Sequence, residues 1–346
     1  MINNDASSDT IVKNKDKYSW IFIFFFLILY VGLRHQVGGD WGNYLVNYYF
    51  VTDTLSEYFA VHGIRAVKDF SFVMINRFAS GINGTIYLSN MILAIMFISF
   101  LIKFCKNNPR PWLGLLILSP YFINVVGMGY NRQAIAIAIF MMALIQLEKF
   151  NYTKFFLWMT FATTFHFSAL FMFPLGLVNF FKVKKTILVS LVILFSLIYY
   201  FFFHTMISMT FHNFFSIGYS SSGAYVRALM SAAPAIILLI FQKRLLNDIK
   251  NILIWKWIAW LSIMTFCVLP FIPSTAAVDR VGLYLIPIQV FTLTRLPNLF
   301  AKYNKSHYFI YLFTVFSYFI ILLIWAFWGS FSHWWYPYDN ILFKLI

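Results

Sequence analysis

The stretch "WIFIFFFLILYVGL", residues 20–33, is an almost wholly apolar run, and the polar stretch "RHQVGGDWGNYLVNYY", residues 34–49, follows it directly. Apolar runs of this kind recur along the chain, separated by short polar breaks. Hydrophobic residues make up 61% of the chain and charged residues 11%, which leaves too little polar surface to cover a water-soluble core. In lipid only helices and closed barrels satisfy the backbone, and a barrel would show alternating segments of about ten residues. The sequence therefore predicts an all-α, polytopic integral membrane protein.

We expect about eleven transmembrane helices (ten to twelve) within a single domain, residues 1–346. Their expected ranges are 19–33, 86–102, 112–126, 131–147, 155–166, 167–181, 186–204, 227–241, 252–271, 281–295 and 308–328. The stretch 155–181 fits either two short spans or one tilted span, because each half reaches only about 20 Å across a core of roughly 30 Å.

The polar tail 1–18 carries three lysines, and no small-residue cleavage site follows the first apolar run. This pattern predicts a retained signal anchor with a cytoplasmic N-terminus. The segments 34–85, 205–226 and 329–346 then face outward, and 34–85 is apolar enough to form interfacial helices. This topology puts 18 of the 26 basic residues on the inner side, which agrees with orientation by positive charge and explains the net charge of +15. No basic, aromatic-interleaved soluble domain is present, so we expect no nucleic-acid partner.

Arginine dominates the few basic residues on the expected outer side. The six outer arginines are Arg34, Arg65, Arg77, Arg132, Arg227 and Arg280. The planar, permanently charged guanidinium suits phosphate groups, whereas lysine suffices for orientation. Arginine side chains that snorkel to the membrane interface are the alternative explanation.

Arg132 lies in "GMGYNRQAIAIAIF", where two glycines break the chain before an inward helix. The N-terminus of that helix, with Gln133 beside Arg132, is suited to an anion. Arg280 in "PSTAAVDRVGLYLIP" and Arg227 in "YSSSGAYVRALM" repeat the arrangement, so three arginines at outer helix ends would suit a pyrophosphate. Headgroup anchoring is the alternative for Arg132, and Asp279 could cap a helix and pair locally with Arg280.

Two residues are candidate proton acceptors. Asp40 is a carboxylate in the glycine-rich turn "VGGDWGNY", and His166 lies in the apolar stretch "ATTFHFSALFMFP". Either side chain could remove a proton from a sugar hydroxyl. Alternatively, Asp40 caps the following helix and His166 is a hydrogen-bonded strut between helices. Tyr44 could stack on a sugar ring, or belong with Trp41 to an interfacial aromatic belt.

The positions of the acidic residues and cysteines argue against a cation-coupled transporter, a disulfide and a zinc site. All eleven carboxylates lie at termini, loops or span ends, whereas cation-coupled transporters usually need one near the middle of a span. Cys105 and Cys267 are far apart and form no Cys/His cluster, so the sequence predicts neither a disulfide nor a zinc site.

The chain resembles the EpsG-type, Wzy-like bacterial polysaccharide polymerases. The resemblance rests on "RHQVGGDWGNY", "YNRQAIAIAIF", "FHFSALFMFPL", "DRVGLYLIPI" and "YPYDNILF", whose order and spacing run through most of the chain. The family-like positions are Arg34, Asp40, Tyr44, Arg132, Gln133, His166 and Arg280.

The resemblance implies polymerisation of undecaprenyl-pyrophosphate-linked oligosaccharide repeat units into O-antigen or capsular polysaccharide. It places this glycosyl transfer at the outer face of the bacterial inner membrane, with no metal or other cofactor. It also implies contact with membrane lipid and with a membrane protein that regulates chain length. A lipid-linked oligosaccharide flippase and a membrane O-acyltransferase are the alternatives. A flippase would line a cavity through the bilayer with charge, and an acyltransferase would use a buried histidine such as His166.

Overall fold

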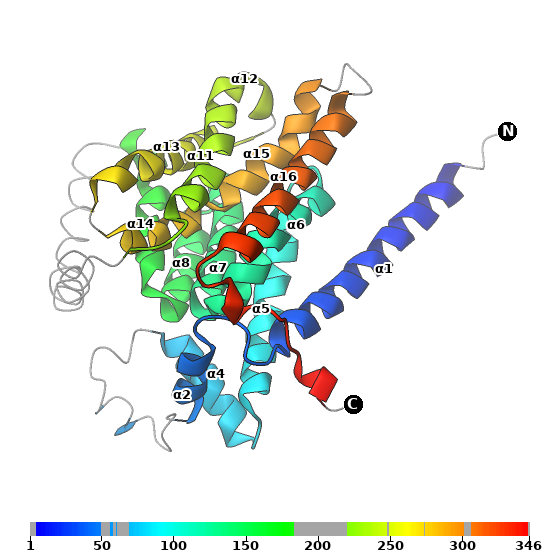
Figure 1. Ribbon diagram of the computed structural model, residues 1–346. Coiled ribbons are helices and arrows are strands. Elements are labelled where there is room, and N and C mark those ends of the chain that lie inside the picture. Colours follow the sequence, from blue (N-terminus) through cyan, green and yellow to red (C-terminus); the bar gives the residue numbers. More distant parts are fainter. Residues whose placement is uncertain are drawn as a thin grey trace.

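The computed structural model describes residues 5–49, 56–57, 60, 69–182, 220–247, 249–272, 274–300 and 306–344, and these form helices and connecting turns (Figure 1). The elements are α1 (Asp5–Gly32), α2 (Trp41–Tyr49), α4 (Phe70–Gly81), α5 (Ile86–Lys106), α6 (Pro111–Leu118), the π-helix η2 (Ser119–Gly127), α7 (Asn131–Glu148), α8 (Tyr152–Phe165), η3 (Phe167–Lys182), α11 (Ala224–Ile240), α12 (Gln242–Leu245), α13 (Ile252–Val268), η6 (Leu269–Phe271), α14 (Thr275–Gly282), η7 (Leu283–Leu285), α15 (Pro287–Arg295), η8 (Leu296–Phe300), α16 (Ser306–Trp328), η9 (Ser332–Trp334) and η10 (Ile341–Lys344). The predicted span 186–204 and most of the predicted loop 205–226 lie outside the described residues.

The described helices are those of a membrane protein. Three of them are long and apolar enough to cross a bilayer, namely Ile86–Lys106, Ile252–Phe271 and Tyr308–Trp328. The pair Thr275–Leu285 and Pro287–Leu299, bent by 43°, gives a fourth if it forms one span. Only 11% of the apolar window in α16 is buried inside the protein, so most of that helix presents hydrophobic side chains outward. The expected count of about eleven spans stays a prediction.

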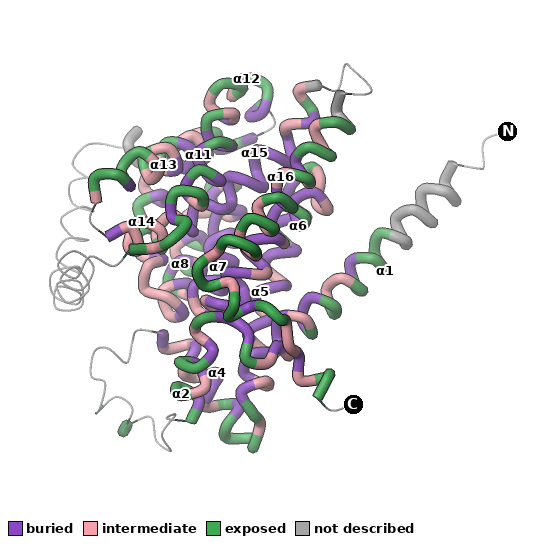
Figure 2. Tube along the Cα trace, in the orientation of Figure 1, coloured by how far each residue is buried: buried purple, intermediate pink, exposed green. Residues whose placement is uncertain are grey.

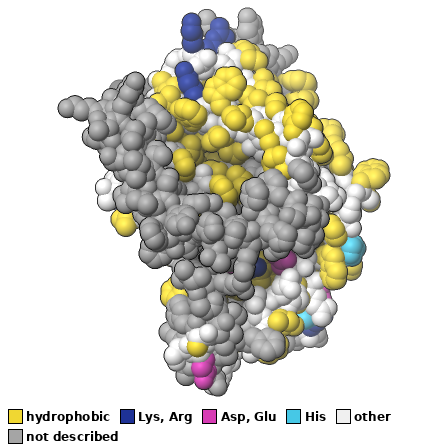
Figure 3. Space-filling view, turned by 90° about the vertical axis from the view of Figure 1, so that its left-hand side faces the viewer, with side chains coloured by type: hydrophobic (Ala, Val, Ile, Leu, Met, Phe, Trp, Pro, Cys, Tyr) yellow, Lys and Arg dark blue, Asp and Glu magenta, His cyan; other side chains and the backbone are white. Residues whose placement is uncertain are grey.

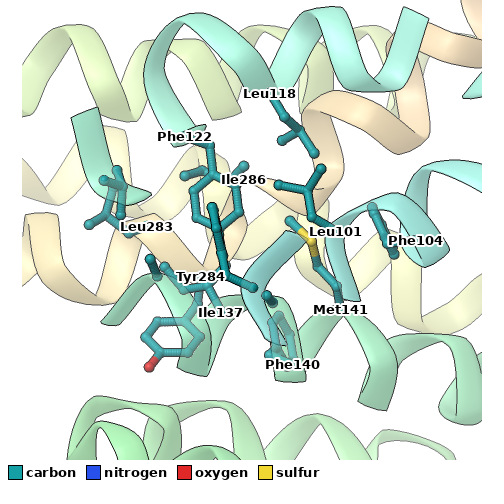
Figure 4. Close-up of a cluster of buried hydrophobic side chains, with 14 of the residues drawn as sticks. Leu101, Phe104, Leu118, Phe122, Ile137, Phe140, Met141, Leu283, Tyr284 and Ile286 are labelled. Carbon is teal, nitrogen blue, oxygen red and sulfur yellow. The ribbon is translucent and has the colours of Figure 1, made fainter. Parts of the chain in front are cut away.

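Helix α7 lies at the centre of the bundle and is buried along its length (Figure 2). Its small alanines allow close approach of neighbouring helices, as is common in membrane bundles. Phe140 and Met141 of α7 pack in a cluster with Phe122 of η2 and Ile286 beside η7 (Figure 4). This packing holds the middle of α7 at a fixed position relative to η2 and η7.

The stretch 155–181 is divided at His166. Helix α8 ends at Phe165, His166 is extended, and the 3₁₀ helix η3 begins at Phe167. The segment is therefore two helical pieces and not one continuous helix.

At one end of the bundle, the turns expected on the cytoplasmic side contact one another. Arg295 donates to the side chain of Asn108 at 2.7 Å, and Arg110 donates to the carbonyl of Thr294 at 2.9 Å. Asn251 donates to the carbonyl of Leu147 at 2.9 Å. Figure 3 shows basic side chains gathered at the top edge of one face, above a broad hydrophobic area. Which side of a membrane this end faces stays a prediction.

At the opposite end, Arg34 is buried, with a side chain only 1% exposed. Its Nη1 donates to the carbonyl of Val31 at 2.6 Å, and its Nε donates to the carbonyls of Val37 and Met128 at 3.3 and 3.1 Å. Its Nη2 donates to Oδ1 of Asn131 at 2.7 Å. A buried charge is stable only when it is hydrogen-bonded, and these four acceptors supply the bonds. Arg34 thereby connects the end of α1, the glycine-rich turn and the start of α7.

The segment 334–341 closes this end from the other side. The amide of His35 donates to Asp339, that of Gly38 to Trp334, and that of Ile341 to Leu33, at 3.0, 2.8 and 3.0 Å. In Figure 1 the end of α1 and the C-terminal segment meet at the lower part of the bundle.

Two glycines permit this close packing. Gly38 has φ +104°, and a Cβ there would lie 2.5 Å from the carbonyl oxygen of Met128. A Cβ at Gly129 would lie 2.2 Å from the Trp335 ring.

We expect Arg34→Ala to lower the stability of the protein strongly. The variant leaves several buried acceptors without their donor, at a cost of about 1–3 kcal/mol each. The measurement is the thermal unfolding midpoint of the purified protein in detergent, with Arg244→Ala as the control because Arg244 is exposed on α12. Equal midpoints for the two variants would show that Arg34 does not hold this end together.

Candidate functional site

The first turn of α7 contacts four different segments through three consecutive residues. Asn131 accepts from Arg34 and donates to Oδ1 of Asn90 at 3.1 Å. Arg132 forms an ion pair with Asp69, and Gln133 donates to the carbonyl of Arg280 at 2.6 Å. This turn therefore fixes the relative positions of α1, α4, α5 and α14 at one end of the bundle.

Arg132 is held by one carboxylate and two aromatic rings. Its Nη1 lies 2.5 Å from Oδ2 of Asp69, the residue that precedes α4. Its guanidinium lies 5.6 Å from the ring centroid of Tyr44 and 5.7 Å from that of Phe72, a distance at which cation–π attraction operates. The side chain of Arg132 retains 27% exposure, so it is accessible from one side while fixed on the others.

Asp40 lies beside this arginine, at the start of α2. The hydroxyl of Tyr44 donates to Oδ2 of Asp40 at 3.4 Å. Burial raises the pKa of the Asp40 carboxyl, while the positive charges of Arg132 and Arg280 and the hydrogen bonds from Tyr44 and Asn43 act in the opposite direction. Burial also raises the pKa of the Tyr44 phenol, so Tyr44 stays protonated and remains a donor. Asp40 is thus a half-buried carboxylate under the influence of two arginines from distant parts of the chain.

Arg280 is exposed and lies in the last turn of α14. Gln133, which is only 4% exposed, binds the backbone carbonyl of Arg280 and so sets where α14 ends relative to α7. The sequence predicted Gln133 as a substrate contact, whereas the structure places it as a support for Arg280.

Arg227 and Asp279 form a second, bidentate ion pair. Nε and Nη2 of Arg227 lie 2.7 and 2.8 Å from Oδ1 and Oδ2 of Asp279. Ser221 donates to Asp279 at 3.0 Å and accepts from Arg227 at 2.6 Å. The sequence left local pairing of Asp279 with Arg280 as an alternative, and in the structure Asp279 of α14 forms its ion pair with Arg227 of α11. The arginine lies 5.9 Å from the ring centroid of Tyr121, at the mouth of a recess lined by small and apolar side chains.

The two ion pairs are connected through Gln133, because it follows Arg132 in α7 and binds the carbonyl of Arg280, the residue after Asp279. The charges of Arg227, Asp279, Asp40 and Arg280 all act on the phenol of Tyr130, the residue that precedes α7. The structure therefore connects the three arginines that the sequence predicted separately, but Arg280, predicted at the start of an inward helix, lies in the last turn of α14. Within the described ranges, no group of three or more His, Cys, Asp or Glu side chains is placed to hold a metal ion.

The sequence model of the EpsG family matches residues 17–340, nearly the whole chain. The chain belongs to the EpsG family. This is a family of Wzy-like polysaccharide polymerases, which gives the protein a general role in polysaccharide polymerisation. No curated protein and no solved structure matches the chain.

In this EpsG-family protein, His166 belongs to a hydrogen-bonded chain. Its Nδ1 lies 2.6 Å from Oγ of Ser168, and that hydroxyl donates to the Tyr284 hydroxyl at 3.2 Å. The ring of Tyr284 lies in the hydrophobic cluster while its hydroxyl points away from it (Figure 4). This chain connects η3 to η7, which is the geometry of an interhelical strut. The role of His166 as a base stays a prediction.

The role of Arg34 in the structure also differs from the predicted one. The sequence predicted a substrate contact, but its guanidinium is enclosed and donates to three backbone carbonyls and Asn131. This arrangement makes Arg34 a support for the site, because its donors are engaged within the protein.

Sequence reasoning missed two members of the site in this EpsG-family protein. Asp69 appeared only as one of several outer carboxylates, although it is the ion-pair partner of Arg132. Tyr130 was not singled out, although it stands in the same quoted motif as Arg132. Its place directly before a helix start, after two glycines, was the available signal.

We expect a double-mutant cycle on Arg227 and Asp279 to show favourable coupling of about 0.5–3 kcal/mol, because the pair is bidentate and mostly buried. The variants are Arg227→Ala, Asp279→Ala and the double variant, compared by thermal unfolding. Lys344 and Asp339 form a more exposed pair, so the same cycle there should give a smaller value. Equal coupling in both cycles would contradict the geometry described for Arg227.

Proposed function

We propose that this EpsG-family protein polymerises oligosaccharide repeat units that are linked to a polyprenyl pyrophosphate, such as undecaprenyl pyrophosphate. The growing glycan would move from its lipid pyrophosphate to a hydroxyl of the next lipid-linked unit. The reaction would take place at the outer face of the bacterial inner membrane and build O-antigen or a capsular polysaccharide.

One observation carries the proposal. Asp40 is half-buried under the joint influence of Arg132 and Arg280, which come from α7 and α14. The positive charges of two guanidinium groups, which suit a pyrophosphate, thus act on a carboxylate that can accept a proton. Glycosyl transfer from a lipid pyrophosphate needs both groups close together.

In the proposed reaction, the acceptor hydroxyl attacks the anomeric carbon of the donor sugar. A new glycosidic C–O bond forms, and the bond between that carbon and the pyrophosphate oxygen breaks. Asp40 takes the hydroxyl proton, and the pyrophosphate leaves with the electron pair. Arg132 and Arg280, with Arg227 nearby, neutralise the charge that develops on the leaving group without a metal ion. Fixed donors in a partly dehydrated site are effective because they need no reorganisation during the reaction.

Two features support a polymerase over the alternatives. The site's charges gather at one end of the bundle, whereas a flippase needs a polar path through it. His166, the residue an acyltransferase would use, is part of the strut to Tyr284. The broad apolar surface of α16 suits membrane lipid, and a chain-length regulator is a further proposed partner.

We expect Arg280→Ala to slow chain growth so strongly that single lipid-linked repeat units accumulate. Loss of one donor to a developing oxyanion costs about 100- to 1,000-fold in rate. The measurement is the length distribution of surface glycan in a deletion strain that carries the variant on a plasmid. Arg280→Lys keeps the charge without the planar fork and should give short chains.

Arg244→Ala is the matched control, because it removes an exposed arginine from α12. It should give chains of normal length. The same assay on membranes with added EDTA should show continued polymerisation. Long chains with Arg280→Ala would refute the pyrophosphate assignment. Absence of all surface glycan in the deletion strain, with the repeat unit made, would indicate a flippase. Full-length glycan lacking acyl groups would indicate an acyltransferase.

We expect the polymerisation rate to fall as the pH drops, with a midpoint above the ordinary aspartate pKa of about 4. The reason is that burial raises the pKa of Asp40, and only its ionised form accepts a proton. Arg280→Ala removes a positive charge that lowers this pKa, so the midpoint should move to higher pH. The measurement is the normalised pH–rate profile of each variant. An acidic limb that does not move in Arg280→Ala would exclude Asp40 as the titrating base.

A further inference from the structure

Tyr44 of α2 contacts both the proposed base and one of the proposed pyrophosphate ligands. Its hydroxyl donates a long hydrogen bond to Oδ2 of Asp40, at 3.4 Å. Its ring centroid lies 5.6 Å from the guanidinium of Arg132, within the range of cation–π attraction. The proposed reaction gives Tyr44 no role of its own, although the two ends of this one side chain reach two groups that the reaction uses.

The side chain of Tyr44 is enclosed by protein. Tyr44 is only 2% exposed, and its ring lies 5.3 Å from that of Phe72, centroid to centroid, at an angle of 51°. Phe72 belongs to α4, which lies beside α2 at the lower end of the bundle in Figure 1. The sequence allowed Tyr44 to stack on a sugar ring, but the enclosed ring has no open face for one. Tyr44 therefore acts through its neighbours and not by touching a glycan.

The backbone of α2 fixes the spacing between Asp40 and Tyr44. The amide of Tyr44 donates to the carbonyl of Asp40 at 2.9 Å, so the two residues lie one helical turn apart. Side chains four residues apart lie on the same face of a helix, which lets the phenol reach the carboxylate. The guanidinium of Arg132 lies 5.7 Å from the ring of Phe72 as well, so the two packed rings together limit where it can move.

We propose that Tyr44 is a positioning residue that holds the Asp40 carboxylate and the Arg132 guanidinium in a fixed arrangement. Its hydroxyl orients the base, and its ring keeps the arginine in place for the pyrophosphate. This inference rests on the proposed function, because it concerns the same reaction. It gives one buried phenol two effects that substitution can separate, one through the hydroxyl and one through the ring.

Loss of the Tyr44 hydroxyl has a defined effect on Asp40. Burial raises the pKa of the Asp40 carboxyl, and the positive charges of Arg132 and Arg280 lower it. The hydrogen bonds from Tyr44 and Asn43 also lower this pKa. Removal of the Tyr44 hydroxyl therefore raises the pKa of Asp40, and the base becomes protonated at a higher pH.

The test begins with Tyr44→Phe, which keeps the ring and removes only the hydroxyl. The full chain is placed in liposomes with lipid-linked repeat units extracted from the deletion strain, and the rate of chain growth is measured against pH and substrate concentration. The acidic limb of the normalised pH–rate profile should move to higher pH by about half a unit to one unit, because a hydrogen bond to the ionised carboxylate is lost. The KM for the lipid-linked unit should stay the same.

Tyr44→Leu removes the ring as well, so the cation–π contact with Arg132 is lost. Its KM for the lipid-linked unit should exceed that of Tyr44→Phe by about threefold to tenfold. Thermal unfolding midpoints are measured for both variants. A loss of stability alone would lower the amount of active protein without moving the acidic limb, and the profile of Tyr44→Phe decides the inference if Tyr44→Leu does not fold.

Tyr49→Phe is the matched control, because Tyr49 is an exposed tyrosine of the same helix. Its pH–rate profile and its KM should equal those of the wild type. A shift of the acidic limb in Tyr49→Phe as large as that in Tyr44→Phe would contradict a specific role for Tyr44.

The remaining results separate this inference from the proposed function. An acidic limb that moves in Arg280→Ala but not in Tyr44→Phe would overturn the role of the hydroxyl and leave the proposed function standing. Equal KM values for Tyr44→Phe and a folded Tyr44→Leu would overturn the role of the ring in the same way. A wild-type protein that does not lengthen the lipid-linked units would overturn the proposed function together with this inference.

Discussion

The hydrogen bonds of the buried Arg34 guanidinium are the constraint on which the rest of this end of the bundle depends. A buried cation is costly unless acceptors surround it, and here they come from the end of α1, from the turn that follows it, and from both sides of Tyr130. Once Arg34 is in place, Asn131 is fixed, and the first turn of α7 is oriented by it. Arg132 and Gln133 then point to Asp69 and to the carbonyl of Arg280. Arg34 therefore helps to position the charged side chains near Asp40, although Arg34 itself takes no part in the proposed reaction.

The arginines of the site are held in place by ion pairs and by a hydrogen bond. Arg132 and Arg227 form ion pairs with carboxylates, and Gln133 donates a hydrogen bond to the backbone carbonyl of Arg280. Such pairing lowers the cost of gathering several cations in a partly buried place. The family match extends to residue 340, so the segment around Trp335 that closes the site falls within the region shared with EpsG proteins. A polymerase that adds successive units benefits from a site that keeps its shape between additions.

Local features of the site could be predicted from the sequence, and long-range ones could not. The start of a helix near Asn131 follows from two glycines before an apolar run, and the helices at 252 and 308 follow from hydrophobicity alone. Arg132 and Arg227 were likewise found near helix starts from their spacing to glycine, whereas Arg280 lies in the last turn of α14 and not at the predicted helix start. The pairing of Arg132 with Asp69 and of Arg227 with Asp279 depends on tertiary packing, because the partners are 63 and 52 residues apart. The sequence predicted Arg34 as a substrate contact for the same reason. Its acceptors include backbone carbonyls, and because every residue has a carbonyl, the sequence does not show which ones bind Arg34.

The contacts of the segment 334–341 have a consequence for how the protein matures. Tyr338 donates to the carbonyl of Tyr30, and Asn340 donates to that of Leu29, across 308 and 311 residues of chain. At about 5–20 residues per second, the ribosome needs roughly 15 to 60 s to cover that interval. Throughout that time the turn that bears Asp40 has no partner on its Trp335 side. Nascent and truncated chains are therefore expected to lack a completed site, so synthesis of this segment marks the moment at which the site is complete.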